Sequence, residues 1–546
     1  MEGLVQCSAN YLPLTPVSFL ERAATVYGDK TSIIYGTVRF SWAETYERCL
    51  KVASALVQLE ISHGDVVAIL APNIPALYEL HFSVPMAGAI LSALNTSVDA
   101  TTLAFMLQQL NAKLFFVDYQ CLTVALQALD ILSSENIKQQ PKLILIPEFE
   151  KPTPSTPSKH KSSSTLDYIA LLQMGNSDFE VIPPKNECDP ISVSFTSGST
   201  GNPKGVIYSH RAAYLNSLAD IFRCDMRERL IVFLWTLDMF RCNGWCLTWA
   251  MAAIGGTNIC LRNVSAEVIF EAIILHKVTH LCGPPTILNV IANALPDEKN
   301  RSRHKVNVIV AGGLLNTKIL LKVEELGFNV IDGYGMTEAL GPAIVQPLKL
   351  DSASSNGELQ NPLMEGVDVK DPNTMKSVPY DGKTLGEVMF KSNILMSGYL
   401  KNTEATQEAF NGGWYHTGDV GVRHPNGSIQ MKDRAKDIIV VNEGEIISTL
   451  EVEAILLSHP KILRVAVIGK SDDGLKEVVL PCAFVKLKDG FDANAQEIIQ
   501  FCSGQLPNYM VPKSVIFGDL PINFTGKVQK FVLREKVNAI NIANCK

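Results

Sequence analysis

The chain of 546 residues has few charged residues and no excess of positive charge. Asp, Glu, Lys and Arg make up 19% of it, and 48 basic against 55 acidic residues leave a formal net charge of −7. A mildly acidic chain lacks the basic surface with which proteins bind nucleic acid through its phosphates. We therefore expect no nucleic-acid partner, although a locally concentrated positive charge could still bind a small acidic or phosphorylated substrate.

The sequence also lacks a continuous apolar segment of the roughly 20 residues that a membrane-spanning helix requires. Its longest apolar stretch, from Trp245 to Leu261, is interrupted at residues 255–258 by two glycines and two polar residues. This pattern predicts a buried helix, a turn and a strand. The N-terminus, Met1 to Leu4, has no basic segment followed by an apolar one, so we expect no secretory leader.

The twelve cysteines include no Cys-x-x-Cys motif. Cys242 and Cys246 are four residues apart, a spacing that could place two metal ligands on one helix face, but no nearby His or Cys pair would complete a zinc site. We therefore expect reduced, packed thiols and a reducing compartment.

The chain is nevertheless rich in the material of a buried core. Hydrophobic residues make up 47% of it, which excludes disorder, and its length predicts about three or four folding units, or two with one of them large. Continuous apolar strands alternate with helical patterns, which predicts an α/β fold with mainly parallel sheets covered by helices on both faces. Strands are expected at 66–70, 114–117, 143–146, 257–261, 280–282, 308–310 and 329–331, and helices at 76–86, 266–275, 286–294 and 318–326.

The pattern changes near residues 433–437, within a charged run. Strands are expected at 438–441, 465–468 and 483–485, and helices at 449–458, 494–502 and 528–537. These elements indicate a small α+β domain of about 110 residues. We therefore predict a large N-terminal domain at 1–433 and a small domain at 434–546, with a hinge near 434–436.

The strongest local signal is the segment from Phe195 to Gly205, which follows an expected strand at 191–194. Its glycines allow backbone N–H groups to converge on an anion, and its hydroxyls and Lys204 add donors and charge. The segment lacks the Gly-Lys-Ser/Thr of a Walker loop. It therefore predicts a polyphosphate-binding loop of another kind.

This loop resembles the phosphate-loop signature of the acyl-adenylate-forming (AMP-binding) superfamily, and other segments match that superfamily in order. They are Gly333–Glu338 (adenine and magnesium), Tyr415–Asp419 (ribose), Asp433–Lys436 (hinge) and Thr525–Lys530 (catalytic lysine). Leu12–Pro16, Ser209–Arg211 and Cys242–Trp245 make the chain most similar to plant acyl-activating enzymes. Those are carboxylate–CoA ligases of the benzoate, cinnamate and short- or medium-chain fatty-acid type.

The resemblance implies a fold and a reaction. The fold has a large N-terminal domain of layered sheets with a smaller β subdomain, followed by a small mobile α+β domain. In the reaction, a carboxylate attacks the α-phosphate of ATP, giving acyl-AMP and pyrophosphate, and the thiol of coenzyme A then displaces AMP. ATP, Mg²⁺ and coenzyme A are therefore the expected cofactors and co-substrates. Because the first step brings two anions together, catalysis is expected to rest on positioning and charge neutralisation.

The resemblance also assigns roles to individual residues. Those expected to bind the nucleotide and coenzyme A are Thr196, Ser197, Gly198, Ser199, Thr200, Lys204, Asp332, Gly333, Tyr334, Thr337, Asp419, Arg434, Lys436, Gly444, Glu445 and Lys527. Within this set, Asp419 would bind the ribose with Arg434 beside it, and Lys436 would be the pivot. Thr200 and Glu338 would bind Mg²⁺ through oxygen. Lys527, Thr200, Glu338 and Arg241 form the expected catalytic group.

The acid pocket is expected near Arg241–Asn243, Gly312–Gly313 and Gly333–Leu340. Its predicted lining residues are Cys242, Asn243, Gly312, Gly313 and Leu340. Aromatic and medium aliphatic acids are both compatible with this pattern. At Arg241 the similar plant enzymes carry a histidine, and a permanently charged arginine could bind an additional substrate carboxylate or block the pocket. Glu443 places a negative charge where the pantetheine would pass.

These departures motivate two alternative functions, a degenerate nucleotide-binding homologue and an enzyme that loads another thiol acceptor. No carrier module follows the small domain, so the second alternative ranks last. Many plant relatives end in a Ser-Arg-Leu-type peroxisomal tripeptide, whereas this chain ends Asn544-Cys545-Lys546. We therefore expect a cytosolic location, with the peroxisome as the alternative; the sequence indicates no oligomeric state.

Overall fold

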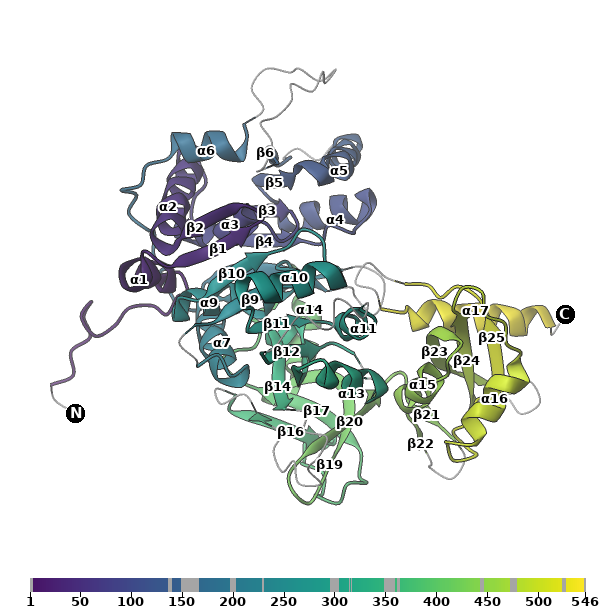
Figure 1. Cartoon of the computed structure of the whole chain (residues 1–546). Coiled ribbons are helices and arrows are strands. Elements are labelled where there is room, and N and C mark those ends of the chain that lie inside the picture. Colours follow the sequence, from purple (N-terminus) through teal and green to yellow (C-terminus); the bar gives the residue numbers. More distant parts are fainter. Residues whose placement is uncertain are drawn as a thin grey trace.

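The computed structural model describes residues 3–135, 140–148, 166–196, 203–227, 230–294, 304–313, 315, 317–347, 359–360, 364–441, 446–471, 479–522 and 527–544. Their strands and helices form a large lobe and, beside it, a smaller C-terminal lobe (Figure 1).

Two large sheets, mainly parallel, form the framework of the large lobe. The first has the strand order β15 (Leu359–Gln360), β14 (Gly341–Pro347), β13 (Phe328–Met336), β12 (Val306–Ala311), β11 (His280–Gly283), β9 (Val232–Trp235), β10 (Thr257–Cys260), β1 (Thr31–Tyr35) and β2 (Val38–Ser41). The second has the order β18 (Gly398–Tyr399), β8 (Lys204–Ser209), β7 (Pro190–Thr196), β4 (Ile90–Leu94), β3 (Val66–Leu70), β5 (Leu114–Asp118) and β6 (Lys142–Ile146).

Helices lie between these sheets and on their outer faces. Those between the sheets include α1 (Ser18–Tyr27), α2 (Trp42–Gln58), α3 (Pro75–Met86), α7 (His210–Arg223) and α9 (Leu247–Ile254). All twelve residues of α3 are buried, as expected of a helix enclosed on every side. The outer faces carry α10 (Ala266–His276), α11 (Thr286–Ala292) and α13 (Thr317–Glu325) on the first sheet, and α4 (Ala100–Leu110) and α5 (Leu122–Ser134) on the second.

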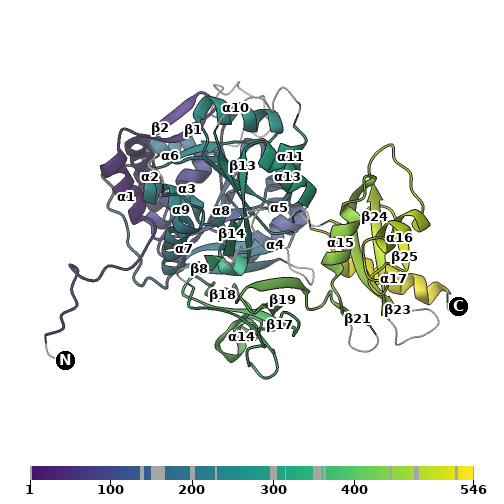
Figure 2. The same ribbon diagram turned by 60° about the horizontal axis from the view of Figure 1, so that its bottom comes forward.

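A smaller antiparallel sheet adjoins the two large ones. It contains β16 (Gly366–Lys370), β17 (Gly386–Lys391), β19 (Tyr415–Arg423) and β20 (Ile429–Arg434), with α14 (Thr403–Ala409) nearby. Figure 2 shows this sheet at the edge of the large lobe, from which the chain continues to β21 in the small lobe. The remaining large-lobe helices are α6 (Tyr168–Met174), α8 (Cys242–Trp245), η1 (Tyr119–Cys121), η2 (Thr337–Ala339) and η3 (Asn411–Gly413).

The small lobe has hydrophobic cores of its own. It consists of β21 (Ile439–Val440), β22 (Ile446–Ile447), α15 (Thr449–Leu457), β23 (Ile462–Ser471), β24 (Val479–Leu487), α16 (Ala495–Ser503), β25 (Ser514–Phe517) and α17 (Lys530–Asn544). One core lies against α15 and α16, and the other lies under α17. Separate cores fit the prediction of a separate C-terminal unit, while the boundary between residues 433 and 434 stays a prediction.

The α/β architecture predicted from the alternation of strands and helices is confirmed. The predicted strand at 66–70 has the same bounds as β3, and the apolar stretch from Trp245 to Leu261 contains α9, a turn at Gly255 and β10. Within the described residues, none of the helices combines the length and the hydropathy needed to cross a lipid bilayer.

Candidate active site

Asp419 in the middle of β19, Arg434 at the end of β20 and Tyr334 near the end of β13 lie together. Asp419 pairs in register with Arg434 across the antiparallel strands, so their side chains lie on one face. The Arg434 Nε lies 2.7 Å from Asp419 Oδ1, and the Tyr334 hydroxyl donates to Asp419 Oδ2 at 2.6 Å. Burial raises the pKa of Asp419, while the charge of Arg434 opposes that shift. The sequence-predicted ribose carboxylate is therefore a buried acceptor already held by two donors.

A second carboxylate, that of Glu338, is held by a tyrosine. Glu338 lies in the short helix η2, and its Oε1 accepts a hydrogen bond from the Tyr399 hydroxyl at 2.9 Å. The Lys204 Nζ lies 4.9 Å from the centre of the Tyr399 ring, within cation–π distance. Tyr399 thus connects the predicted phosphate-binding lysine to the predicted magnesium ligand.

Sequence reasoning did not single out Tyr399. It follows Gly398 in the two-residue strand β18, which pairs with Val206 and Ile207 of β8. The pairing of distant segments places it in the site, and no motif at that point of the sequence indicates it.

Lys527 reaches these residues from the C-terminal part of the chain. Its side chain is accessible to solvent in a region crowded with protein atoms. Burial lowers the pKa of its amino group, the charge of Arg434 lowers it further, and the charge of Asp419 raises it. Arg241 also lowers the pKa of Lys527. Arg434 and Arg241 therefore both act on Lys527, although these three cations lie 93 to 286 positions apart in the sequence.

The segment after Arg241 has an unusual backbone. Cys242, Asn243, Trp245 and Cys246 all have positive φ angles, from 48° to 60°, and Gly244 between them has φ 60°. A left-handed conformation costs a non-glycine residue about 1–2 kcal/mol, so the surrounding packing must hold this turn in place. Cys242 and Cys246 therefore do not share a helix face, because the chain forms a left-handed turn there.

This turn packs against the segment that contains the predicted adenine motif. The Cys242 Sγ lies 3.5 Å from Thr337 Oγ1, and Asn243 Nδ2 donates to the Ser192 hydroxyl of β7. Asn243 is fully buried, and its Oδ1 has no hydrogen-bond partner among the residues that the structure describes. Arg241 itself points to a different partner, because its Nε lies 3.0 Å from Asp238 Oδ2.

The predicted pocket glycines lie at the carboxyl end of β12. Ala311 pairs with Gly333 of β13, which brings Gly312 and Gly313 beside the adenine motif. Gly312 has φ +96°, and apart from its neighbours in the chain no atom of the described residues lies within 4 Å of where its Cβ would be. Leu340, also predicted to line the pocket, is fully buried among core residues. Open space is therefore found at Gly312, and none is available at Leu340.

Asp332 and Gly335 show how tightly the adenine motif is built. Burial raises the pKa of Asp332 to about 6, opposed by a hydrogen bond from the Gly333 backbone. A Cβ at Gly335 would lie 1.9 Å from the carbonyl oxygen of Gly341, so only glycine fits this position.

Two aspartates tie the predicted hinge to the small lobe. Asp433 Oδ2 accepts hydrogen bonds from the backbone N and the hydroxyl of Thr449, each at 2.6 Å, at the start of α15. Asp437 forms an ion pair with Arg534 of α17. Lys436, the predicted pivot, lies exposed between them. The sequence marked this charged run as a hinge, but the partners in α15 and α17 could not be read from it.

Several predicted site residues lie outside the described residues. They are Ser197, Gly198, Ser199, Thr200, Glu443, Gly444 and Glu445. Thr196, at the end of β7, is described; its hydroxyl lies 3.5 Å from the carbonyl oxygen of Lys204, across the loop from it.

Comparisons with known proteins agree with this arrangement. Residues 20–400 match the AMP-binding enzyme family, and residues 451–527 match the AMP-binding enzyme C-terminal domain. The chain is 46% identical to "Probable acyl-activating enzyme 21" of Arabidopsis thaliana, over 98% of this chain and 97% of that protein. It is 44% identical to "Acetate--CoA ligase CCL3" of Humulus lupulus, over 98% and 97%, and 42% identical to the peroxisomal benzoate–CoA ligase of Arabidopsis thaliana, over 98% and 95%.

Solved structures share the fold at lower sequence identity. The anthranilate CoA ligase AuaEII in complex with anthranoyl-AMP superposes with a TM-score of 0.81 at 21% identity, over 97% of this chain and 99% of that one. The MatB protein of Rhodopseudomonas palustris with bound ATP gives 0.79 at 22% identity, over 96% and 99%.

Proposed function

This chain belongs to the AMP-binding enzyme family, and from that membership we propose that it is a carboxylate–CoA ligase that forms acyl-AMP from ATP and a small carboxylic acid. The relatives named for acetate, butyrate, benzoate and cinnamate support an acid of this class. The observation that carries the proposal is that Arg434 and Lys527 act together on the carboxylate of Asp419, with Arg241 acting on Lys527.

This convergence fits the chemistry of the first half-reaction. A carboxylate and an α-phosphate are both anions, so their approach requires nearby positive charge. Lys527 donates to one oxygen of each and holds them together. Asp419 accepts from the ribose hydroxyls, and Arg434 fixes the orientation of that carboxylate.

The donors near the phosphates fit a magnesium ion. Glu338 offers a carboxylate oxygen, the type of ligand that Mg²⁺ prefers, and the Tyr399 hydroxyl fixes its orientation. Glu338 together with Thr200 would hold the ion, which supplies positive charge to the phosphates when it is bound. Lys204 contributes a further charge on the same side.

The second half-reaction transfers the acyl group from acyl-AMP to the thiol of coenzyme A, and AMP leaves. The sulfur–carbon bond forms as the bond from the acyl carbon to the phosphate oxygen breaks, and the thiol proton is released. The match of residues 451–527 to the C-terminal domain of the family supports a small domain that serves both steps.

The test is ATP–pyrophosphate exchange with Mg²⁺ across short aliphatic acids, benzoate, cinnamates and dicarboxylates, followed by mass spectrometry of products formed with coenzyme A. We expect exchange with one group of monocarboxylic acids and an acyl-CoA product. Lys527→Ala should slow exchange about 10²–10³-fold, whereas replacement of Lys513, an exposed lysine of the same lobe, by alanine should leave the rate unchanged. If a folded protein that binds ATP shows no exchange with any of these acids, the proposed ligase activity is wrong.

One observation favours the alternative of a nucleotide-binding homologue with impaired turnover. Arg241 lies beside the left-handed turn that the predicted pocket contains, and its pairing with Asp238 holds a charged side chain there. Under this alternative, Arg241→His restores turnover that the natural chain lacks. Activity of the natural chain on a monocarboxylic acid would eliminate it.

We propose a cytosolic location for the reaction. Since several relatives are named as peroxisomal, imaging of fluorescent fusions at either terminus, with a peroxisomal marker, is the test.

A further inference from the structure

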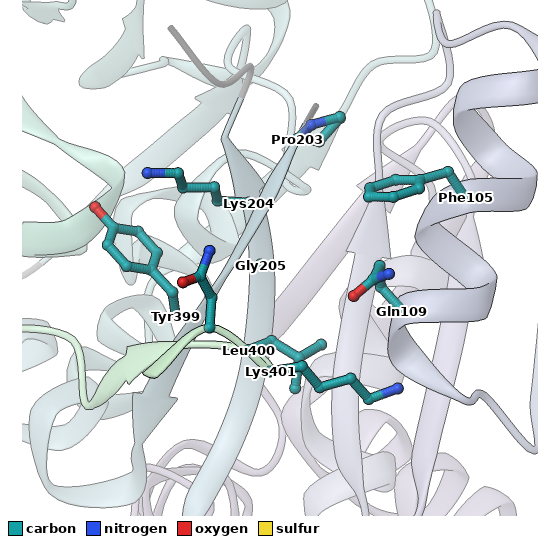
Figure 3. Close-up of a pocket in the computed structure, with 9 residues that line it drawn as sticks. Phe105, Gln109, Pro203, Lys204, Gly205, Tyr399, Leu400 and Lys401 are labelled. Carbon is teal, nitrogen blue, oxygen red and sulfur yellow. The ribbon is translucent and has the colours of Figure 1, made fainter. Parts of the chain in front are cut away.

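A hollow of about 350 Å³ lies beside Lys204, between α4 and the segment that follows β18. Its lining residues are Phe105, Gln109, Pro203, Lys204, Gly205, Tyr399, Leu400, Lys401 and Asn402. They come from α4, from the start of β8 and from the segment that follows β18 (Figure 3). The hollow therefore adjoins the C-terminal end of the predicted phosphate loop.

The polar groups of the hollow favour an anion. Among the described residues that line it, two are lysines, two carry side-chain amides and none is acidic. Lysine ammonium groups and amide N–H groups are donors, and phosphate oxygens are the acceptors they commonly bind.

The two lysines lie at different depths. Lys204 is partly buried, and its amino group points towards Tyr399, whereas Lys401 is exposed, and its amino group extends below Gln109 (Figure 3). An anion released beside Lys204 would therefore meet a second cation nearer to solvent. The volume lies at the small end of the range for ligand pockets, which suits a small hydrated anion better than a whole nucleotide.

We propose that this hollow is a subsite for pyrophosphate, which moves from Lys204 past Lys401 when it leaves the active site. This inference rests on the proposed function, because adenylation is the step that releases pyrophosphate. Tyr399 joins the two sites, since its ring lies beside Lys204 and its hydroxyl holds Glu338.

The backbone at Lys401 determines which substitution tests the subsite. Lys401 has φ 53°, a left-handed conformation that asparagine adopts more readily than most residues. Lys401→Asn therefore removes the charge with little change in backbone strain. Lys277 offers a matched control, because it is also an exposed lysine with a left-handed backbone, φ 58°, at the end of α10.

The experiment measures pyrophosphate binding by calorimetry and the KM for pyrophosphate in the exchange reaction. We expect Lys401→Asn to weaken the binding of pyrophosphate about tenfold and to change the KM for ATP less than twofold. A tenfold loss of affinity corresponds to about 1.4 kcal/mol, the effect of losing one charge–charge contact. Lys277→Asn should match the natural chain. Gln109→Glu places a negative charge in the hollow and should weaken the binding of pyrophosphate at least as much as Lys401→Asn does.

Two results would overturn the subsite. Equal pyrophosphate affinity in Lys401→Asn and Lys277→Asn, with both variants folded by circular dichroism, shows that Lys401 does not contact this anion. If Lys401→Asn weakens the binding of coenzyme A but not that of pyrophosphate, the hollow binds the phosphates of coenzyme A instead. Failure of the proposed function is distinguishable, since it abolishes exchange in the natural chain, whereas calorimetry still reports on pyrophosphate.

Discussion

Replacing Asp419 with asparagine tests the central contact of the site. The carboxylate accepts from Tyr334 at 2.6 Å and from Arg434 at 2.7 Å. In Asp419→Asn, one amide oxygen can still accept from Tyr334. The amide nitrogen then faces Arg434, so two donors oppose each other and the negative charge is lost.

The magnitude follows from these two contacts. A hydrogen bond to a charged group contributes about 1.5–3 kcal/mol, and the bonds that Asp419 would make to the ribose weaken as well. We therefore expect the KM for ATP to rise about 30- to 150-fold, which corresponds to about 2–3 kcal/mol. Arg434 is partly accessible to solvent, so the effect on the free energy of unfolding should be smaller.

A matched control exists in the same sheet. Asp368 of β16 accepts from Arg423 at 2.6 Å and from Ser377 at 2.6 Å, and it is buried. Asp368→Asn should lower the free energy of unfolding by about 2–3 kcal/mol and leave the KM for ATP unchanged.

The assay is exchange at varied ATP, with denaturant unfolding of both variants. If Asp419→Asn raises the KM for ATP no more than Asp368→Asn does, the assignment of Asp419 to the nucleotide is wrong. Asp419 also raises the pKa of Lys527, so its loss should move the alkaline fall in activity to lower pH.

Three further predictions concern the neighbouring residues. Lys527→Ala should reduce the rate of acyl-AMP formation about 10²–10³-fold with ATP still bound, as measured by single-turnover assay and calorimetry. In the natural chain, kcat/KM for the acid should fall as pH rises through the pKa of Lys527, which is below the ordinary 10.5 of a lysine, because the charged amino group is the active form. Arg241→Gln should move that fall to higher pH, since Arg241 lowers the pKa of Lys527. Lys527→Arg should remove the fall. Tyr399→Phe should raise the Mg²⁺ concentration needed for half-maximal exchange, since Glu338 loses the donor that orients it; an unchanged Mg²⁺ requirement would argue against Glu338 as a ligand.

The sequence predicted the fold well because burial determined its elements. Strands such as β3 and β5 are continuous apolar runs enclosed on both faces, and such runs are visible without a structure. The left-handed turn after Arg241 could not be predicted in the same way. Asn243 and Gly244 favour a left-handed backbone, but Cys242, Trp245 and Cys246 do not, and their burial within the core accounts for the rest of the turn.

The residues of the candidate site also fall into those that the sequence could identify and those that it could not. Residues such as Asp419 and Lys527 could be named from the sequence, because they lie in motifs that resemble those of the acyl-adenylate-forming superfamily. Their partners could not, since Tyr399 and Arg534 reach the site or the hinge through pairing and packing of distant segments. Arg241 combines both situations. The sequence shows an arginine where the similar plant enzymes carry a histidine, but its ion pair with Asp238 is seen only in the structure.

The cations of the site explain why the small lobe needs firm attachment near the hinge. Burial lowers the pKa of Lys527 most, and before any anion binds the charges of Arg434 and Arg241 also repel its ammonium group and lower that pKa further. Contacts elsewhere must offset this repulsion to hold the lysine in place. Among the contacts that the structure describes near the hinge are the Asp433 bonds to α15, the Asp437–Arg534 pair and the Lys432–Glu451 pair at 3.0 Å. A bound carboxylate and phosphate replace the repulsion with attraction, so ligand binding and lobe attachment should strengthen one another.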